Sequence, residues 1–483
     1  MVKITVKKSQ LNGEISCPPS KSYSHRAIVI SSLSNGESYL KNVLISRDTL
    51  ATINCCKMLG ITIESESFTK RKQQASHTYG YSFSNTVKNL KVLSKGGRTG
   101  FSTPEDILNA ENSGTTIRLL SSMCSLVNNG LTILTGDKSL RKRPMGDLIK
   151  SLNQLGVECI SSNIYNTPPL IVKGGGMKGG EAVISGQISS QFISSLLLSC
   201  IYAKTKTRIK VLGKQVSKPY INSTISIMEK FGVEIENNPY NIERELPFPK
   251  SSYLKDNTVA NTVDYDIENN TITESYTIPN DKDYSPTTFR VPGDFSTAAL
   301  LISSAILSDG ELTIDNLDFS LPQGDSNIIN IVKEMGADII VDKCNGQVKV
   351  TGTRLLDGGE FNLKDTPDLL PVVSILALKC KNSIKITGIS HARYKETDRV
   401  ANIATQLIKF GAEVKEELDS IVINPPKKIN SASINSFEDH RLFMAFCIAS
   451  LTTEESKIDG AEFADVSYPG FIGEMKRLGA SIV

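Results

Sequence analysis

The sequence predicts an α/β protein in two domains, built from repeats of one structural unit. At 483 residues the chain is too long for one ordinary hydrophobic core. A segment of helical periodicity that ends in a large apolar residue, a glycine and a small or β-branched residue occurs six times, at residues 59–61, 155–157, 231–233, 335–337, 410–412 and 478–480. Glycine directly after a helix is the usual left-handed cap. Each occurrence therefore predicts the end of a helix and the start of a strand.

An earlier helix in each unit is apolar on almost every face, as at residues 189–202 and 296–307. A helix without a polar face must be buried. A strand follows each such helix, as at residues 208–211 and 311–314. We therefore expect units of two helices and about four strands, three units in each domain, with buried central helices beneath outer sheets.

Two stretches interrupt this pattern. Residues 65–100 are rich in Ser, Lys and Gly, and residues 237–290 hold many Asn, Asp, Thr, Tyr and Pro but few aliphatic side chains. Such compositions are typical of segments that bury little apolar surface. We expect both to be extended surface insertions, the second a hairpin near the domain boundary.

Composition and charge exclude several classes of protein. The net charge is only +3, so anion binding must come from local clusters and not from the basic field of a nucleic-acid-binding protein. No apolar run approaches the length of a membrane span, and the alternating N-terminus has no signal-peptide core. The nine cysteines lack a C-x-x-C pair, and the four histidines lack metal-ligand spacing. We expect a cytoplasmic monomer with no metal, cofactor, nucleic-acid or membrane partner.

Residues 391–399 form a dense charged cluster between an expected strand at 384–389 and an expected helix that continues through Val400. The cluster holds three cations and two carboxylates: Arg393, Lys395, Arg399, Glu396 and Asp398. A helix start favours anions, and on a helix Lys395 and Arg399 share a face. A carboxylate held among cations can carry a proton while the cations hold an anionic substrate. The alternative is a solvated, charged first turn.

Three further clusters suit the binding of anions. Lys21 and Arg26 flank an expected helix start that also carries serine hydroxyls, an arrangement suited to phosphate or to a simple N-cap. Gly114, in the motif at residues 112–118, allows close backbone approach to a ligand, or forms a tight turn. Arg143 precedes a proline, which holds its backbone extended in a basic turn.

Other segments supply uncharged polar groups and single acids. Residues 185–192 and 216–221 hold hydroxyls, an amide and a phenol, which recognise a sugar-like ring by hydrogen bonds. Asp368 stands before an apolar helix, where it is either a site acid or an N-cap. Residues 438–441 open another apolar helix with Arg441 at its start.

Taken together, these motifs resemble the 3-phosphoshikimate 1-carboxyvinyltransferase (EPSP synthase) family of enolpyruvyl transferases. They run in one order along nearly the whole chain, at residues 19–22, 112–115, 143–144, 189–192, 217–220, 367–368, 395–399 and 439–441. The resemblance implies an inside-out barrel of two domains and six βαβαββ units. It places domain one at residues 1–20 plus 291–483 and domain two at residues 21–290, with an active site in the cleft between them that closes on ligand.

The reaction implied by the resemblance transfers the enolpyruvyl group of phosphoenolpyruvate to the 5-hydroxyl of shikimate 3-phosphate and releases phosphate, without metal or cofactor. The methylene carbon must be protonated and the hydroxyl deprotonated, so the site needs two acid/base groups. By resemblance Glu396 faces the methylene, Asp368 faces the 5-hydroxyl, and Lys21 bridges both substrates.

The resemblance also implies the substrate-binding residues. Shikimate 3-phosphate would be held by Lys21, Ser22, Arg26, Ser189, Ser190, Gln191, Ser217, Tyr220, Asp368, His391 and Lys395. Phosphoenolpyruvate would be held by Lys21, Gly114, Arg143, Gln191, Arg399 and Arg441. The phosphate and the carboxylate of phosphoenolpyruvate account for so many separate cations in one cleft.

The sequence departs from the family pattern at three positions. His391 stands where many members have Asn, and Leu119 stands where Pro is frequent. Val466 occupies the position of a lysine that binds phosphoenolpyruvate in many members. Either another cation, Lys476 or Arg118, takes its place, or the enzyme works with a higher KM for phosphoenolpyruvate.

Two other functions compete with this interpretation. One is the sister enolpyruvyl transferase that acts on UDP-N-acetylglucosamine. Against it, Lys21 is followed by Ser and not by Asn, and residues 136–143 contain no cysteine to serve as its acid. The other is a non-catalytic anion-binding protein on the same scaffold, which the presence of both Asp368 and Glu396 disfavours.

Overall fold

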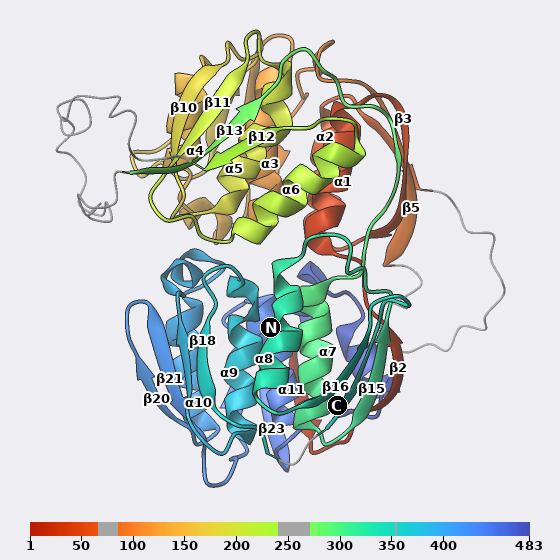
Figure 1. Cartoon of the computed structure of the whole chain (residues 1–483), viewed down its shortest axis with the longest axis vertical. Helices are drawn as coiled ribbons and strands as arrows, with labels where there is room; N and C mark the ends of the chain where they lie inside the picture. The colour runs from red at the N-terminus through yellow and green to blue at the C-terminus, as the bar shows by residue number, and fades with distance from the viewer. Residues whose placement is uncertain (66–85, 240–270, 353–354) are drawn as a thin grey trace.

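A computed structural model describes residues 1–65, 86–239, 271–352 and 355–483. Figure 1 shows two lobes stacked along the long axis, each with helices in its interior and sheets on its outside. Among the described residues, no helix combines the length and the apolar character that a membrane crossing requires. The α/β fold class predicted from the sequence is confirmed.

Six four-stranded sheets occur among the described residues, three in each lobe. Each sheet has one parallel and two antiparallel strand pairs. The upper lobe holds three sheets: β14 (Thr288–Arg290), β3 (Asn35–Leu44), β5 (Val87–Lys95) and β4 (Thr62–Ser65); β6 (Leu108–Asn109), β7 (Leu131–Thr135), β9 (Leu170–Lys173) and β8 (Cys159–Ser161); and β10 (Gly180–Ser185), β11 (Thr207–Leu212), β13 (Ile272–Ile278) and β12 (Glu236–Pro239).

The lower lobe repeats the same arrangement. Its sheets are β2 (Asn12–Ser16), β15 (Glu311–Asp315), β17 (Gln347–Thr351) and β16 (Asp338–Asp342); β18 (Gly359–Asn362), β19 (Ile384–Thr387), β21 (Ser420–Asn424) and β20 (Glu413–Glu416); and β22 (Ser433–Ile434), β23 (Glu455–Asp459), β1 (Lys3–Lys7) and β24 (Ser481–Ile482). The predicted sixfold repeat of two helices and four strands is therefore confirmed.

Buried inner helices form the centre of each lobe. They are α1 (Lys21–Leu33), α3 (Gly114–Met123) and α5 (Ser190–Ser199) above, and α7 (Phe295–Leu307), α9 (Leu370–Leu376) and α11 (His440–Ser450) below. Some serines inside these helices donate a hydrogen bond to a backbone carbonyl of the preceding turn. Ser32 donates to the carbonyl of Ile28, and Ser450 donates to that of Phe446. The hydroxyls of Ser31, Ser303 and Ser374 in these helices are buried without a hydrogen-bond partner among the described residues, so the pairing of the inner serines is incomplete.

A second helix in each unit ends in the predicted glycine cap. These helices are α2 (Arg47–Met58), α4 (Gly146–Gln154), α6 (Lys218–Lys230), α8 (Ile328–Glu334), α10 (Arg399–Lys409) and α12 (Phe471–Arg477). The glycine that follows each has a positive φ, between 80° and 118°. That conformation favours glycine, so the six caps recognised in the sequence mark real helix ends.

The chain passes twice between the lobes. β1 and β2 lie in lower-lobe sheets, whereas β14 pairs with β3 in the upper lobe just before α7 begins. One hydrophobic cluster contains core residues from 4–17 and 295–482, and the other contains core residues from 23–291. These clusters support the predicted domain boundaries near residues 20 and 290, which we retain as a proposal.

The two predicted insertions are corrected by the structure. β5 lies within residues 65–100 as a central strand, because it pairs with both β3 and β4, and its Leu90 and Val92 are buried in the upper core. β13 lies within residues 237–290 between β11 and β12, and its buried Tyr276 and Ile278 belong to the upper core despite the low aliphatic content of the segment. The predicted hairpin at the centre of this segment falls on residues 240–270, which lie outside the described residues.

Candidate active site

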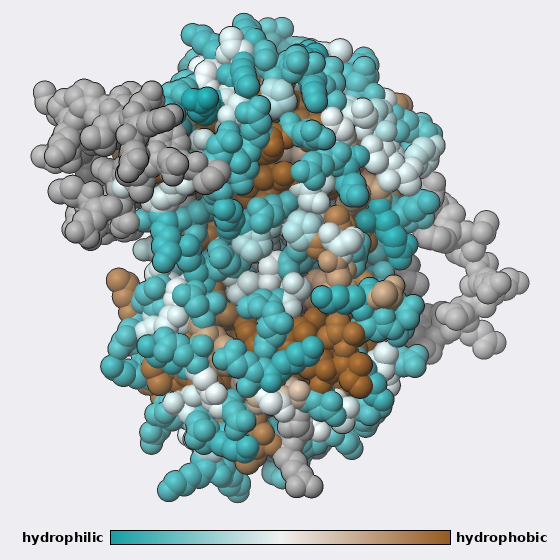
Figure 2. All heavy atoms as spheres, viewed as in Figure 1, coloured by the Kyte–Doolittle hydropathy of each residue, from teal (hydrophilic) through white to brown (hydrophobic). Residues whose placement is uncertain are grey.

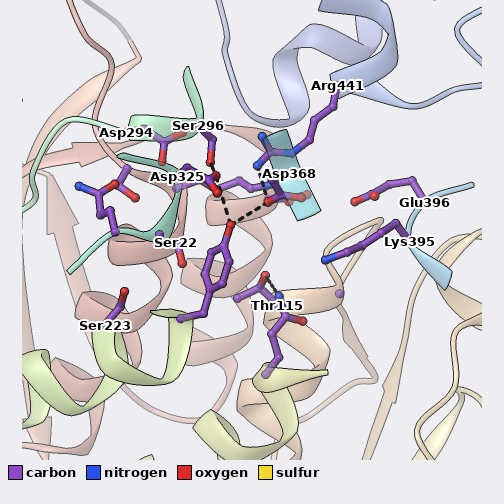
Figure 3. Close-up of a pocket in the computed structure, with 18 of the residues that line it drawn as sticks. Ser22, Thr115, Ser223, Asp294, Ser296, Asp325, Asp368, Lys395, Glu396 and Arg441 are labelled. Carbon is purple, nitrogen blue, oxygen red and sulfur yellow. Dashed lines mark hydrogen bonds and ion pairs between the residues drawn. The ribbon is translucent and has the colours of Figure 1, made fainter. Parts of the chain in front are cut away.

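A single pocket between the lobes collects most of the predicted site residues. Those that line it are Lys21, Ser22, Gly114, Arg143, Gln191, Tyr220, Asp368, Lys395, Glu396, Arg399 and Arg441. They come from distant parts of the sequence because helix starts from both lobes point toward the same space. Figure 3 shows Lys395, Glu396 and Arg441 facing Ser22 and Thr115 across this pocket.

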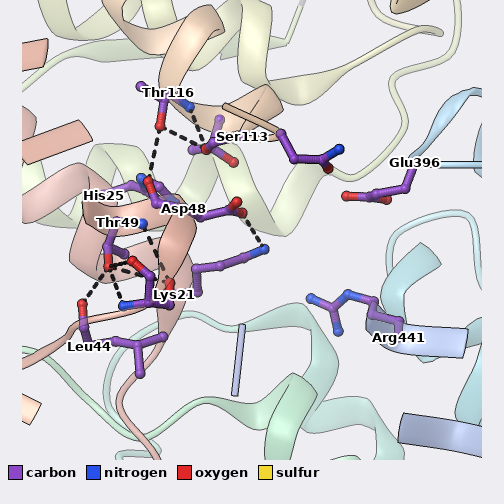
Figure 4. Close-up of polar contacts among 12 residues, drawn as sticks. Lys21, His25, Leu44, Asp48, Thr49, Ser113, Thr116, Glu396 and Arg441 are labelled. Atoms are coloured by element: carbon purple, nitrogen blue, oxygen red, sulfur yellow. Dashed lines mark hydrogen bonds and ion pairs between the residues drawn. The ribbon is translucent and has the colours of Figure 1, made fainter. Parts of the chain in front are cut away.

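The start of α1 supplies Lys21 to the upper wall. Ser20 is the N-cap of this helix and accepts a hydrogen bond from the backbone N–H of Tyr23. The Lys21 ammonium lies 2.8 Å from Oδ2 of Asp48. Figure 4 shows the Lys21–Asp48 pair left of centre, with Glu396 and Arg441 on the right. Lys21 is thus held by one carboxylate while it faces the pocket.

Arg26 lies directly behind the pocket wall and has only uncharged partners. Its Nε donates to the Thr224 hydroxyl at 2.7 Å, and Nη1 and Nη2 donate to the Ser22 hydroxyl at 2.5 Å and the Tyr220 carbonyl at 3.0 Å. Burial lowers the pKa of Arg26 to about 10, so the side chain stays protonated at neutral pH. Arg26 therefore fixes Ser22 and Tyr220 and adds positive charge beneath them.

Two arginines meet at the start of α3. Nη1 of Arg118 donates to Oε1 of Gln191 at 2.8 Å, and Nη2 of Arg143 donates to Oδ1 of Asn112 at 2.9 Å. Burial, and then the neighbouring Arg143, lower the pKa of Arg118 to about 9. A Cβ at Gly114 would meet Nη1 of Arg143 at 2.8 Å, so a larger residue here would displace the Arg143 guanidinium from its present position. Paired guanidinium groups with amide partners form a site for an anion.

Carboxylates surround Arg399 in the lower wall. Its Nε donates to Oδ2 of Asp439 at 2.8 Å, Nη1 to Oδ1 of Asp368 at 3.0 Å, and Nη2 to Oε2 of Glu396 at 2.6 Å. Burial alone would lower the pKa of Arg399, but the three carboxylates raise it above its ordinary value. With 1% of its side chain exposed, Arg399 orders the acids of this wall.

Asp368 and Glu396 are the two pocket acids expected to act in catalysis. Asp368 also contacts Arg441 at 2.8 Å, and Glu396 lies 3.9 Å from Arg143 of the opposite wall. Burial raises the pKa of each carboxyl, but the surrounding cations lower it further, chiefly Arg441 for Asp368 and Arg399 for Glu396. Both are therefore ionised at neutral pH in the absence of ligand.

The cluster at residues 391–399 is not the start of a helix. A short 3-10 helix, η9 (Ser390–Tyr394), precedes an irregular segment, and α10 begins only at Arg399. Asp398 caps α10 by accepting from the backbone N–H of Ala401 at 3.1 Å, and that capping places Lys395 before the helix. The expectation that Lys395 and Arg399 share a helix face is wrong.

The segment that carries Lys395 and Glu396 is held from outside the pocket. Nη1 of Arg393 lies 2.9 Å from Oδ2 of Asp398 and 2.7 Å from Oε1 of Glu416. From the upper lobe, the Ser139 hydroxyl donates to the Glu396 carbonyl at 3.1 Å. Lys395 itself is half-buried, and partial removal from water lowers its pKa. An irregular segment clamped in this way presents both side chains to the same space.

Comparison with known proteins agrees with this geometry. The family model described as EPSP synthase (3-phosphoshikimate 1-carboxyvinyltransferase) matches residues 5–91, 78–245 and 256–475. A protein named 3-phosphoshikimate 1-carboxyvinyltransferase from Nitrosopumilus maritimus is 37% identical over 485 residues, covering 100% of this chain and 99% of its own length. The protein of that name from Methanocaldococcus jannaschii is 38% identical, with 99% and 98% covered. The chain belongs to the EPSP synthase family.

A solved structure is similar to the whole chain in fold. The EPSP synthase of Acinetobacter baumannii has a TM-score of 0.75 at 24% identity, and the match covers 100% of this chain and 99% of that one. The likeness extends over both lobes, so the two-lobed arrangement in Figure 1 is the fold of that structure too. Family membership and fold agree with the resemblance drawn from the sequence motifs.

Five predicted site residues lie beside the pocket and not among its lining residues. Arg26, Ser189, Ser190, Ser217 and His391 form this group. Ser189 caps α5, and Ser217 has a φ of 56° and donates its N–H to the Lys364 carbonyl of the lower lobe. Burial, and then Lys395, lower the pKa of His391 to about 4, so this side chain is neutral.

Val466, at the position of the family lysine, does not line the pocket. It is 6% exposed and ends the 3-10 helix η10 (Ala461–Val466). The exposed Lys476 does not line the pocket either, whereas Arg118 does. The structure therefore brings one of the two suggested substitute cations into the site.

Several pocket residues were missed by sequence reasoning. They are Asp48, Thr115, Ser223, Asp294, Ser296, Gln323, Asp325 and Tyr394. Thr115 stands inside a recognised motif, so its position was available. Tyr394 stands inside the charged cluster at residues 391–399, so its position was available too. The other six lie in no recognised cluster and reach the pocket through tertiary packing.

Proposed function

We propose that this chain transfers the enolpyruvyl group of phosphoenolpyruvate to the 5-hydroxyl of shikimate 3-phosphate, with release of phosphate, in the pocket between its lobes. Membership of the EPSP synthase family supports this reaction. The observation that carries it is the division of the pocket: two ionised carboxylates, Asp368 and Glu396, face Arg118 and Arg143, which have chiefly amide partners.

Glu396 is the proposed acid at the methylene carbon of phosphoenolpyruvate. Without ligand its carboxyl is ionised, because Arg399 and Arg143 lower its pKa. Phosphoenolpyruvate brings a phosphate and a carboxylate beside the same cations, and this added negative charge raises the pKa of Glu396. Glu396 then takes up a proton and delivers it to the methylene, and takes a proton back from the new methyl group when phosphate leaves.

Asp368 is the proposed base for the 5-hydroxyl. Arg399 and Arg441 hold its two oxygens at 3.0 and 2.8 Å, so the carboxylate has a fixed direction toward the pocket. Because a cation contacts each oxygen, Asp368 is a weak base. It removes the hydroxyl proton as the hydroxyl oxygen attacks the oxocarbenium-like carbon, since that attack makes the proton more acidic. Lys21, opposite, lies between the two substrates and offsets their charge.

The two substrates divide the remaining residues. Shikimate 3-phosphate would contact Lys21, Ser22, Arg26, Ser189, Ser190, Gln191, Ser217, Tyr220, His391 and Lys395. Phosphoenolpyruvate would contact Lys21, Gly114, Arg143, Gln191, Arg399 and Arg441, and to these we add Arg118, because its guanidinium lies in the pocket beside Arg143. Arg399 also orients the three carboxylates that it holds.

Phosphate release from the purified chain tests the proposal. We expect phosphate only when phosphoenolpyruvate and shikimate 3-phosphate are both present, and none with either alone. Replacement of shikimate 3-phosphate by UDP-N-acetylglucosamine tests the sister reaction. Release with the nucleotide sugar, or no release from a folded protein that binds both substrates, would overturn the proposal. Action as a monomer in the cytoplasm remains a prediction.

A further inference from the structure

Asp325 is a buried acid of the pocket that the proposed reaction leaves without a role. It lies in the 3-10 helix η6 (Gly324–Asn327) and is 3% exposed. Its Oδ2 accepts a short hydrogen bond from the Ser296 hydroxyl, and its Oδ1 has no hydrogen-bond partner among the described residues. Figure 3 shows Asp325 beside Ser296, on the same side of the pocket as Asp368.

The Tyr220 hydroxyl lies between two carboxyl groups. It is 3.3 Å from Oδ2 of Asp325 and 3.2 Å from Oδ2 of Asp368. A phenol has one proton, so it donates to only one of them. The other contact brings a phenol lone pair against a carboxyl oxygen and is favourable only if that oxygen carries a proton.

The cations decide which carboxyl holds the extra proton. Asp368 makes ion pairs with Arg399 at 3.0 Å and Arg441 at 2.8 Å, which keep it ionised. No ion pair reaches Asp325 from any residue that the structure describes; its contacts are hydroxyl groups. A buried carboxyl without an ion pair favours its neutral form.

We propose that Asp325 is a protonated positioning residue that aims the Tyr220 hydroxyl at Asp368. Ser296 donates to Oδ2 of Asp325, this same oxygen carries a proton that it donates to Tyr220, and Tyr220 donates to Asp368. Each of these three hydrogens then has one acceptor. Asp368, the proposed base, is held in one direction by Tyr220 in addition to Arg399 and Arg441. This inference rests on the proposed function of Asp368.

The surroundings of Asp325 agree with a proton near neutral pH. Burial, and then the Asp368 carboxylate, raise the pKa of Asp325 to about 7, while Arg441 lowers it. The charged and titratable groups that act on it are Asp368, Arg441, Asp294 at the start of α7, and Tyr220. Burial and the neighbouring acids raise the pKa of Asp325 more than Arg441 lowers it.

Infrared spectroscopy on the full chain tests for the proton directly and needs no activity. The wild type at about pH 6 should show the C=O band of a buried protonated carboxyl, reduced at about pH 8.5, and Asp325→Asn should lack it. Asp338→Asn, at an exposed strand position, is the matched control and should retain it. A band that survives in Asp325→Asn, or a wild type without one, would overturn the proposal.

The pH dependence of turnover tests the positioning role. An asparagine amide also donates to Tyr220 but does not ionise, so the ratio of kcat in Asp325→Asn to kcat in the wild type should rise about threefold or more from pH 6 to pH 8.5. Asp325→Ala removes the donor and should lower kcat about tenfold at pH 6, with KM for phosphoenolpyruvate little changed. A purely structural role would lower both variants equally at every pH, and that result would contradict the proposal.

Tyr220→Phe provides a second, independent variant. Without the phenolic hydroxyl the coupling between the acids is broken, so the fall of kcat above pH 7 assigned to Asp325 should disappear. If the fall persists in Tyr220→Phe, Asp325 does not act through the hydroxyl and the inference is wrong. A wild type that shows the infrared band but releases no phosphate would instead contradict the proposed function and leave the protonated Asp325 in place.

Discussion

Buried arginines in the two walls of the pocket have different kinds of partner. In the upper wall, Arg26 and Arg118 donate to hydroxyls, carbonyls and an amide. In the lower wall, Arg399 has three carboxylate partners and Arg441 has one. A buried cation without an acid partner lowers the stability of the folded protein. The charges of Arg26 and Arg118 are therefore balanced only when a ligand supplies negative charge. The lower wall is balanced by itself and holds its acids in place.

This contrast assigns different work to the two walls. The upper wall is built to attract and hold anions, and its guanidinium groups are destabilising without them. The lower wall is built to keep two carboxylates ionised and directed before any ligand arrives. Substitutions of Arg118 and of the lower-wall carboxylates should therefore differ in what they change: ligand affinity for Arg118, and stability or turnover for the carboxylates.

The largest stability effect is expected at Asp439 in the lower wall. Asp439→Asn keeps an N-cap side chain for α11 but removes a carboxylate from the fully buried Arg399. The free energy of unfolding should fall by about 3 kcal/mol, at the low end for a broken buried ion pair because two carboxylates remain. Urea unfolding measures it. Glu158→Gln, which breaks an exposed pair with Lys173, is the control and should cost less than about 1 kcal/mol.

The opposite pattern is expected for Arg118 in the upper wall. Arg118→Gln removes a buried cation whose hydrogen-bond partners are Gln191 and Ser189, so the ligand-free protein should be equally stable or more stable. KM for phosphoenolpyruvate should rise about 10- to 100-fold, the value of one charge-assisted hydrogen bond. Arg208→Gln, in an exposed pair with Glu181, is the control and should change neither quantity. A loss of stability with an unchanged KM would mean that Arg118 stabilises the fold and does not bind phosphoenolpyruvate.

The pH dependence of stability tests the burial of His391 as a neutral side chain in the lower wall. Its pKa is about 4 in the folded chain, because burial and Lys395 lower it, and about 6.5 when unfolded. The neutral side chain contributes stability above pH 6.5, and this contribution is lost as the pH falls toward 4, since only the unfolded chain takes up the proton. His391→Asn should therefore lose about 2 kcal/mol less stability than the wild type between pH 6.5 and 4.5. Equal losses in the two proteins would show that His391 is not buried as a neutral group.

Val466 should show the smallest effect on catalysis. Because Val466 does not line the pocket and Arg118 does, Val466→Lys should change KM for phosphoenolpyruvate by less than about threefold, well below the effect of a new charge-assisted hydrogen bond. KM for shikimate 3-phosphate should also stay the same. A tenfold fall in KM for phosphoenolpyruvate alone would mean that the upper wall lacks a cation at this place.

The repeat was predictable from the sequence because local backbone chemistry marks it. Each left-handed glycine that ends an outer helix has a positive φ, and inner helices such as α7 are apolar on every face. The strands β5 and β13 were missed because their polar residues obscure the alternation, and only their pairing within a sheet makes them strands. Pairing between distant segments leaves little local signal.

The site was predictable where several functional residues stand in one motif. Lys21, Arg143 and Arg441 were found in this way and line one pocket. The helix expected to open at residues 391–399 and to continue through Val400 exists as α10, but its start was placed too early, because the N-cap at Asp398 begins the helix at Arg399. Asp325 was missed because it is a single acid in a loop, and its partners come from other elements, at Ser296 and Tyr220.

The most direct test of this division of work is Glu396→Gln, with binding and turnover measured on the same protein. The amide keeps the shape of the side chain but cannot deliver a proton, so calorimetry should show shikimate 3-phosphate bound within a few-fold of the wild-type affinity, while kcat for phosphate release falls by about 10²-fold or more. A variant that keeps near-full kcat, or one that loses affinity for shikimate 3-phosphate in proportion to its loss of turnover, would contradict the assignment of proton transfer, and not of substrate binding, to Glu396.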